Sequence, residues 1–311
     1  MIAFVFPGQG AQYVGMGREM AAAFPEARRV YERAGEVLGI DLLHLCSEGP
    51  EEALRRTENT QPAILTTSVA CLEVLRSSGI EPDVAAGLSL GEYSALVAAG
   101  ALAFEDAVRV VRRRGELMEE ATRGRETSMV AILGLDAAEV ERICESASSA
   151  GVVEPANFNC PGQVVIAGDS AAVRKASEEA KARGARRIIP LNVSTAFHTT
   201  LMRPAAERLA RELERVAVSD ARFPVVANVT SKSVQRAEEI RRLLIEQVYS
   251  PVRWEESVRQ MWQLGARIFV EVGPGTSLST LIRKTLDGVR TLHVEDPRSL
   301  EETLRALDEF R

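Results

Sequence analysis

Ser89 stands in the pentapeptide Gly87-Leu88-Ser89-Leu90-Gly91, between an apolar segment over 84–87 and another over 92–99. The first segment predicts a strand and the second a helix, and G-x-S-x-G at such a junction is typical of a nucleophile elbow. Flanking glycines suit this sharp turn because it brings backbone segments closer together than side chains would allow. We therefore interpret Ser89 as a nucleophile, with an ordinary glycine-rich turn as the alternative.

A serine nucleophile needs a base, and the chain has only three histidines. His44 lies among apolar residues and His293 follows an apolar stretch, so we interpret both as structural. His198 comes just before a predicted helix, whose N-terminus favours the neutral ring that accepts a proton. His198 is the candidate base, with simple helix capping as the alternative. No carboxylate is marked by its spacing as a third member, but a backbone carbonyl can also orient a histidine.

Arg114 falls within an apolar stripe on the helix predicted over 104–122. A cation in that place must either pair with an internal carboxylate or reach a cleft. In a cleft, its planar fork could hold a substrate carboxylate through two hydrogen bonds. Both interpretations remain open from periodicity alone.

Backbone N–H groups are the expected donors of an oxyanion hole in such a site. Leu90 follows the nucleophile and supplies one donor through the geometry of the elbow. The loop over 7–10 could supply a second, because its glycines let backbone amides approach a ligand closely. A plain turn is the alternative for this loop.

The elements that must position these groups alternate between strands and helices, which indicates an α/β protein. Residues 124–194 have the order β-α-β-β-α-β of a ferredoxin-like unit. We expect an α/β-hydrolase-like catalytic domain with a parallel sheet over 1–123 and 195–311, carrying that ferredoxin-like small subdomain as one wall of a cleft. The pattern predicts strands over 2–6, 84–87, 129–133, 152–157, 163–167, 187–191, 223–227 and 268–272. It predicts helices over 16–38, 62–76, 104–122, 137–147, 171–183 and 255–264, a helical stretch that ends at 248, and a helix that begins at 276.

Composition excludes several classes of function. A net charge of −6 argues against general binding of nucleic acid. No apolar run approaches the ~20 residues of a membrane span. The four cysteines have no paired spacing, which favours a reducing cytoplasm over a disulfide framework and argues against a metal site.

Together these residues resemble the malonyl-CoA:acyl carrier protein transacylases of bacterial fatty acid synthesis. The matching segments follow the family order over nearly the whole chain, at 4–10, 60–63, 87–92, 114–115, 157–165, 197–198, 249–252 and 271–275. One departure is Leu88, where the family commonly has histidine. This concerns the polarity of the elbow and not the acyl transfer.

The resemblance implies an [acyl-carrier-protein] S-malonyltransferase that uses no cofactor or metal. Ser89 would be the nucleophile and His198 the base. Arg114 would bind the malonyl carboxylate, and the backbone amides of Gln9 and Leu90 would form the oxyanion hole. The malonyl group would pass from malonyl-CoA to the phosphopantetheine thiol of acyl carrier protein through a malonyl-serine intermediate.

Two further roles come from the same resemblance. Gln247 matches the glutamine whose main-chain carbonyl orients the histidine, which would account for the missing acid. Phe197 adjoins the base, and in related acyltransferases of polyketide assembly a phenylalanine here accompanies the choice of malonyl over methylmalonyl. An aromatic ring beside the acyl α-carbon would crowd an added methyl group.

The carrier protein of this system is acidic, so an acidic enzyme needs a local basic face to dock it. The candidates on the small subdomain are Arg174, Lys175, Lys181, Arg183, Arg186 and Arg187, with a solvated helix face as the alternative. Two other functions remain open: a thioesterase or esterase with the same elbow, and a non-catalytic module that binds carrier protein. The presence of Ser89, His198 and Arg114 together argues against the second.

Overall fold

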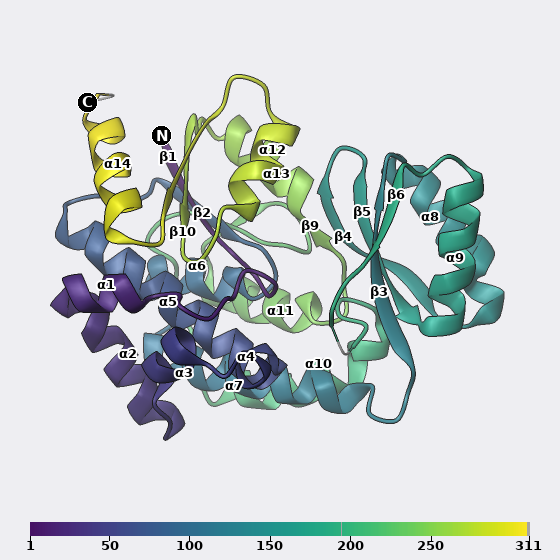
Figure 1. The fold of residues 1–311 in the computed structure, drawn as a ribbon, viewed down its shortest axis with the longest axis horizontal. Helices are drawn as coiled ribbons and strands as arrows, with labels where there is room; N and C mark the ends of the chain where they lie inside the picture. Colours follow the sequence, from purple (N-terminus) through teal and green to yellow (C-terminus); the bar gives the residue numbers. More distant parts are fainter. Residues whose placement is uncertain (194, 310–311) are drawn as a thin grey trace.

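The computed structural model describes residues 1–193 and 195–309 (Figure 1). The strands are β1 (Ile2–Phe6), β2 (Val84–Gly87), β3 (Thr127–Leu133), β4 (Val153–Cys160), β5 (Gln163–Asp169), β6 (Arg187–Pro190), β7 (Val225–Val226), β8 (Ser233–Val234), β9 (Val252–Arg253), β10 (Ile268–Val272) and β11 (Arg290–Val294). The helices are α1 (Arg18–Ala23), α2 (Pro25–Leu38), α3 (Leu42–Glu48), α4 (Glu51–Arg55), α5 (Thr57–Ser77), α6 (Gly91–Ala98), α7 (Phe104–Ala121), α8 (Ala137–Ala147), α9 (Ser170–Ala182), α10 (Arg203–Glu214), α11 (Ala237–Gln247), α12 (Trp254–Gln263), α13 (Ser277–Thr285) and α14 (Pro297–Asp308).

Two mixed sheets organise these elements, which confirms the expectation of an α/β protein. The larger sheet has the order β11-β10-β1-β2-β7-β8, and its first five strands run parallel. The last strand, β8, is antiparallel to β7, so the sheet is not parallel throughout as predicted. β1 and β2 are neighbours, so the loops after them leave the same edge of the sheet. Ligands of open α/β sheets bind at this carboxyl edge.

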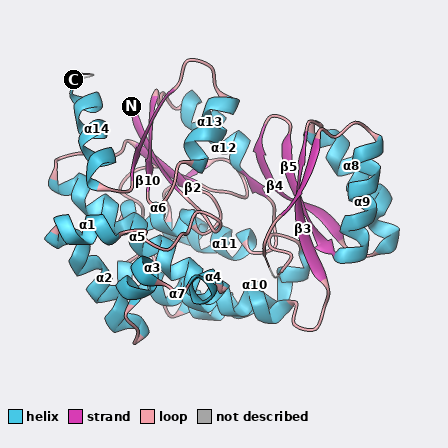
Figure 2. Cartoon of the chain, in the orientation of Figure 1, coloured by secondary structure: helices cyan, strands magenta, loops and turns pink. Residues whose placement is uncertain are grey.

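The smaller sheet has the order β6-β3-β5-β4-β9. Its first four strands are antiparallel and come from the segment predicted as β-α-β-β-α-β, with α8 and α9 packed beside them (Figure 2). The fifth strand, β9, comes from the later part of the chain and pairs with β4 in parallel. This two-residue strand escaped prediction because it is too short for any periodicity. It ties the smaller sheet to the segment that comes after α11.

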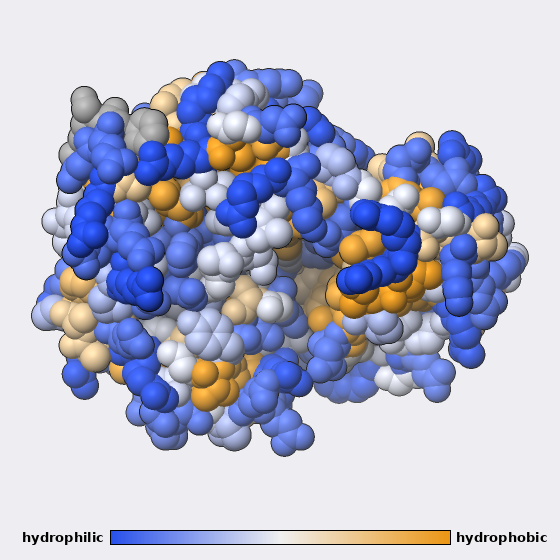
Figure 3. Space-filling view, turned by 45° about the horizontal axis from the view of Figure 1, so that its top comes forward, coloured by the Kyte–Doolittle hydropathy of each residue, from blue (hydrophilic) through white to orange (hydrophobic). Residues whose placement is uncertain are grey.

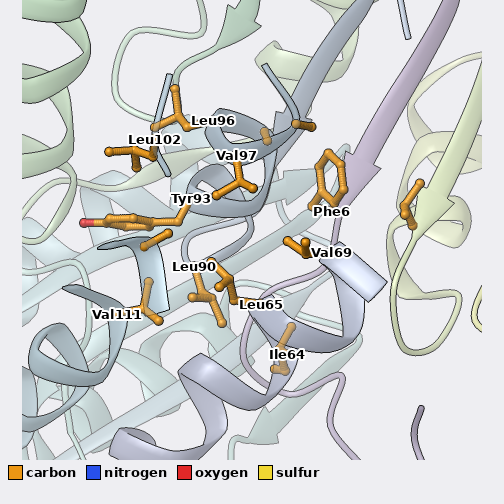
Figure 4. Close-up of a cluster of buried hydrophobic side chains, with 14 of the residues drawn as sticks. Phe6, Ile64, Leu65, Val69, Leu90, Tyr93, Leu96, Val97, Leu102 and Val111 are labelled. Carbon is orange, nitrogen blue, oxygen red and sulfur yellow. The ribbon is translucent and has the colours of Figure 1, made fainter. Parts of the chain in front are cut away.

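Apolar packing fixes the elbow between the larger sheet and its helices. α6 is buried on all sides, beside α5 and α7. Burying each large apolar side chain contributes about 1.5–3 kcal/mol. Figure 4 shows this cluster, with the labelled residues Phe6, Ile64, Leu65, Val69, Leu90, Tyr93, Leu96, Val97, Leu102 and Val111.

Some predicted elements differ from those observed. The helix predicted over 16–38 is two helices, α1 and α2, because Phe24 is extended and Pro25 starts a new helix at its first position. α5 begins at Thr57, well before residue 62. No pattern in the sequence predicted α3, α4, β8, β9, β11 or α14. Residue 194, the predicted end of the small subdomain, lies outside the described residues.

All four cysteines are buried and free. Burial raises the pKa of the Cys46 and Cys144 thiols to about 12, so both stay protonated at neutral pH. In the described part of the chain, no helix is long and apolar enough to cross a lipid bilayer. The same residues contain no group of three or more His, Cys, Asp or Glu side chains that could hold a metal ion.

Candidate active site

The turn from β2 into α6 has the geometry of an elbow. Ser89 lies between the two elements with a positive φ of 53°, a backbone conformation that non-glycine residues rarely adopt. A Cβ atom at Gly87 would lie 1.9 Å from the carbonyl carbon of Gly91, and one at Gly91 would lie 2.1 Å from the Phe6 oxygen. Both glycines are therefore required by close contact, and the strained turn presents the serine at the sheet edge.

Asn228, for which no role was predicted from the sequence, stabilises the elbow through its side chain. Its Oδ1 accepts a hydrogen bond from the Ser89 N–H at 2.7 Å, and its Nδ2 donates to the Gly87 carbonyl at 2.7 Å. One side chain thus satisfies two backbone groups that the turn leaves without partners in the sheet. Asn228 comes shortly after the very short strand β7, and no motif in the sequence marked it.

Ser89 and His198 form a hydrogen-bonded pair. The Ser89 Oγ lies 2.7 Å from Nε2 of His198, and Nδ1 of the ring lies 2.8 Å from the main-chain oxygen of Gln247. A carbonyl only accepts, so Nδ1 carries the proton and Nε2 is left to accept from the serine hydroxyl. Among the described residues, no carboxylate hydrogen-bonds to His198.

The smaller sheet helps to place the histidine. His198 has a positive φ of 60°, and two residues later the N–H and hydroxyl of Thr200 both donate to Glu154 of β4, each at 2.7 Å. The segment that carries His198 is therefore anchored to the smaller sheet.

Burial sets the protonation state of His198. The side chain is 3% exposed, and burial lowers its pKa to about 3, with the Arg114 charge as a second cause. The sequence predicted a neutral ring from a helix N-terminus, and it did not indicate the burial that lowers the pKa most. The 3-10 turn at Thr200–Met202 comes after His198 and runs directly into α10 at Arg203, so the predicted helix is present. Desolvation is nevertheless the largest cause of the lowered pKa.

Arg114 is buried, with 2% of its surface exposed, and its guanidinium faces the Ser89 hydroxyl. It donates to the Oε1 atoms of Gln61 and Gln247, each at 2.9 Å, and to the Ser89 Oγ at 3.1 Å. Within the described residues it forms no ion pair, so its partners are two neutral amides and a hydroxyl. The cation thus keeps a charge that no protein carboxylate contacts directly, as a site for an anionic group requires.

Gln61 reaches Arg114 from α5, next to a proline inside that helix. Pro62 has no N–H to bond with the Glu58 carbonyl four residues earlier. Arg112 of α7 donates to that carbonyl instead, at 3.2 Å, and so helps to join α5 to α7. In the sequence, Gln61 belongs to the matching segment 60–63, and no role was predicted for it.

Glu92 lies behind the site and is buried, with 3% exposed. Its Oε2 accepts hydrogen bonds from the Asn228 N–H at 3.0 Å and from Nε2 of Gln247 at 2.9 Å. Burial raises the pKa of this carboxyl to about 7, partly offset by these bonds and by the Arg114 charge. Sequence reasoning assigned Glu92 no function.

A cavity of about 540 Å³ opens onto Ser89, His198 and Arg114. Figure 3 shows the surface hollowed where the part that contains the smaller sheet meets the rest of the molecule. Phe197 and Leu88 line this cavity, as does the loop carrying Gln9. That loop touches the elbow, because a Cβ atom at Gly8 would lie 2.4 Å from the Leu88 oxygen. A larger cavity of about 790 Å³, lined mainly by charged side chains, shares Gln9 with it but does not include Ser89, His198 or Arg114 in its lining.

The remaining candidates lie elsewhere. His44 is exposed on α3 and His293 is half-buried on β11, and neither lines the cavity with Ser89. In the proposed basic face, Arg183 pairs with Glu139 at 2.5 Å and Glu179 at 2.6 Å, which weakens its attraction for an acidic partner.

The lowered pKa of His198 predicts an unusual pH profile. We expect kcat/KM to stay level as pH falls through 6.5, the ordinary histidine pKa, because the ring remains neutral until near its pKa of about 3. Because the His198 pKa is lower in the folded protein than in the unfolded chain, the free energy of unfolding should decline as pH falls below 6.5. Initial rates and melting temperatures from pH 4 to 8 measure both effects, and an acid limb near 6.5 in a fully folded enzyme would contradict this assignment.

A strained serine beside a buried neutral imidazole and a buried cation is suited to acyl transfer. The chain matches the acyl transferase domain family over residues 3–300. It is 48% identical to the malonyl CoA-acyl carrier protein transacylase of Bacillus subtilis (strain 168), over 99% of this chain and 98% of that one. Identity to the Escherichia coli (strain K12) protein of the same name is 45%, covering 97% and 98%. The chain therefore belongs to the malonyl CoA-acyl carrier protein transacylase family.

Solved structures agree over the full length. The malonyl CoA-acyl carrier protein transacylase from Clostridium perfringens superposes with a TM-score of 0.96 at 43% identity, covering 99% of this chain and 98% of that one. A malonyl-transacylase solved in complex with a type II PKS acyl-carrier protein also gives a TM-score of 0.96, at 44% identity, covering 98% and 99%.

Proposed function

We propose that Ser89, activated by His198, carries the malonyl group during the reaction of this family. As a member of it, the chain is an acyl carrier protein S-malonyltransferase that transfers the malonyl group of malonyl-CoA to acyl carrier protein for fatty acid synthesis. The observation that carries the residue assignment is the contact of 2.7 Å between the Ser89 Oγ and His198 Nε2, at the mouth of a cavity that also contains Arg114.

In the first half-reaction, His198 Nε2 takes the hydroxyl proton as the Ser89 Oγ attacks the thioester carbonyl of malonyl-CoA. The backbone N–H groups of Gln9 and Leu90 stabilise the oxyanion of the tetrahedral intermediate. The intermediate collapses, the C–S bond breaks, and His198 returns the proton to the CoA thiolate. The Gln247 carbonyl, at 2.8 Å from Nδ1, holds the ring and stabilises the transient imidazolium.

In the second half-reaction, the phosphopantetheine thiol of acyl carrier protein attacks the malonyl-serine ester. His198 accepts the thiol proton and then donates it to the departing Ser89 oxygen. Throughout both steps, the Arg114 guanidinium binds the malonyl carboxylate. Hydrogen bonds to this charged group replace hydrogen bonds to its neutral partners in the site.

The two sheets suggest a division of the chain into two domains. We assign 1–123 and 195–311 to an α/β-hydrolase-like catalytic domain and 124–194 to a ferredoxin-like small subdomain. The strand order β6-β3-β5-β4 supports the second assignment, because the two central strands are the first and third of the unit. The buried free cysteines support a cytoplasmic location.

Intact-mass analysis tests the function directly. The protein is mixed with malonyl-CoA, and the expected result is one malonyl adduct, located on Ser89 by peptide mapping and removed by holo-acyl carrier protein. Steady release of free malonate at a rate matching transfer would instead identify a thioesterase. A chain that binds carrier protein without an adduct or turnover would be a binding module.

Phe197 offers a prediction about acyl selectivity. It is 7% exposed and lines the cavity beside His198, so its ring leaves little room for a methyl group on the acyl α-carbon. Phe197→Ser should raise kcat/KM for methylmalonyl-CoA relative to malonyl-CoA, within the about 10–200-fold that a methylene-sized difference allows. The two kcat/KM values for each enzyme decide the matter, and an unchanged ratio would mean that other residues make this selection.

A further inference from the structure

We propose that Glu92 is a positioning residue for carboxylate selection, because it fixes which way the amide of Gln247 faces. This inference rests on the proposed roles of Ser89 and Arg114. It gives a function to a buried acid that lies outside the Ser89–His198 pair and outside the lining of the cavity.

The amide of Gln247 meets different partners at its two ends. Its Nε2 faces three acceptors: the Ser89 carbonyl at 2.9 Å, the Glu92 carboxylate at 2.9 Å and Oδ1 of Asn228 at 3.5 Å. Its Oε1 accepts from Nη2 of Arg114 at 2.9 Å. A flipped amide would place its NH₂ group against the guanidinium and its oxygen against three acceptors, so this network permits one orientation.

Glu92 is well placed to enforce that orientation. Its Oε2 itself accepts a hydrogen bond from the Asn228 N–H at 3.0 Å, and the Asn228 side chain in turn bonds the backbone of Gly87 and Ser89 in the elbow. The acid is therefore anchored to the same framework that carries the nucleophile. Its hydrogen bond to Nε2 of Gln247 fixes the amide, and Oε1 of that amide in turn orients the Arg114 guanidinium.

The amide also works as a spacer between acid and cation. A carboxylate in direct contact with Arg114 would compete with the carboxylate of the substrate for the same N–H groups. Gln247 instead offers a neutral oxygen, which orients the guanidinium and yields more readily to a charged ligand. The arrangement thus holds Arg114 in place while leaving its charge for the malonyl group.

Two substitutions separate the acceptor from the charge. Glu92→Gln can place an amide oxygen where Oε2 stands and keep both hydrogen bonds, so it should retain kcat/KM for malonyl-CoA within about threefold. Glu92→Leu has no acceptor and should lower that kcat/KM about 10–100-fold, the usual effect of losing a supporting shell, mainly through a higher KM. Acetyl-CoA has no carboxylate to be held, so kcat/KM for acetyl-CoA should change little.

Tyr31→Phe is the matched control for stability, because it removes a buried hydrogen bond to Thr67, of 2.7 Å, away from the cavity. It should lower the melting temperature without changing the ratio of malonyl to acetyl transfer. Since Glu92 acts through Gln247, Glu92→Leu should add little to the malonyl defect of Gln247→Leu.

The results that would overturn the proposal are distinct from failure of the function. If the wild-type protein forms the malonyl adduct but Glu92→Leu lowers malonyl and acetyl transfer equally, Glu92 only supports the fold. Loss in Glu92→Gln as large as in Glu92→Leu would show that charge, and not the acceptor, is what counts. If the wild-type protein forms no adduct, the proposed function itself fails.

Discussion

Ser89→Ala is expected to abolish the malonyl adduct and to lower kcat by on the order of 10⁴-fold or more, because the acyl group loses its covalent attachment point. His198→Ala should slow both half-reactions by about 10²–10⁴-fold, the usual contribution of a general base. Since Nε2 lies 2.7 Å from the Ser89 Oγ, the two residues act as a unit. The double variant should therefore be scarcely slower than Ser89→Ala alone.

Ser94→Ala is the control for this experiment. Ser94 is buried on α6, the helix immediately after the elbow, and it does not line the cavity. This variant should form the adduct as the wild-type protein does. Single-turnover rates for the variants and the wild-type protein, with circular dichroism to verify folding, complete the test, and clearly multiplicative losses in the double variant would count against a serine-histidine pair.

The local signals in the sequence were strongest where sterics dictate residue type. Gly87 and Gly91 have to be glycine because a Cβ atom at either would collide with backbone, and this requirement leaves a recognisable pattern around the serine. Arg114 could be noticed because a cation interrupts an apolar stripe on α7. Both signals lie within one element and its turn, which is why they can be read without the fold.

Other parts of the site depend on contacts between distant segments. Asn228 meets Ser89 across 139 residues of sequence, and the amide of Gln247 meets Glu92 across 155. Asparagine and glutamine are mostly found at the surface, so these residue types do not indicate buried hydrogen bonds to Ser89 or Glu92. The same limit applies to β9, whose two residues become a strand only because β4 lies beside them.

The cause of the low His198 pKa shows the same limit. A histidine before a helix is visible in the sequence, and the helix dipole was the physical reason available there. Burial depends on how distant segments of the chain fold together, and it is the largest cause of the lowered pKa. The neutral imidazole was therefore predicted without its largest cause.

Arg114→Ala is expected to reverse the preference of the enzyme among acyl groups. Malonyl-CoA would bring a carboxylate into a buried place without its partner, at a cost of roughly 3–5 kcal/mol. At about 1.36 kcal/mol for each factor of ten, kcat/KM for malonyl-CoA should fall about 10²–10⁴-fold. Acetyl-CoA carries no such charge, so its transfer should be retained or improved. Arg114→Lys should recover only part of the loss, since a point charge cannot replace a planar fork.

The matched control is Arg113→Ala, one residue away on the same helix. Arg113 pairs with Glu116 at 2.7 Å and does not line the cavity, so its loss removes a cation without touching the substrate. The measurement is kcat/KM for malonyl-CoA and acetyl-CoA on each variant, with melting temperatures for all. Equal losses for both substrates in Arg114→Ala would exclude the arginine as the carboxylate ligand. The arginine would then serve the Ser89 hydroxyl and the two glutamines that it already contacts, and selection for malonyl would have to come from the walls of the cavity.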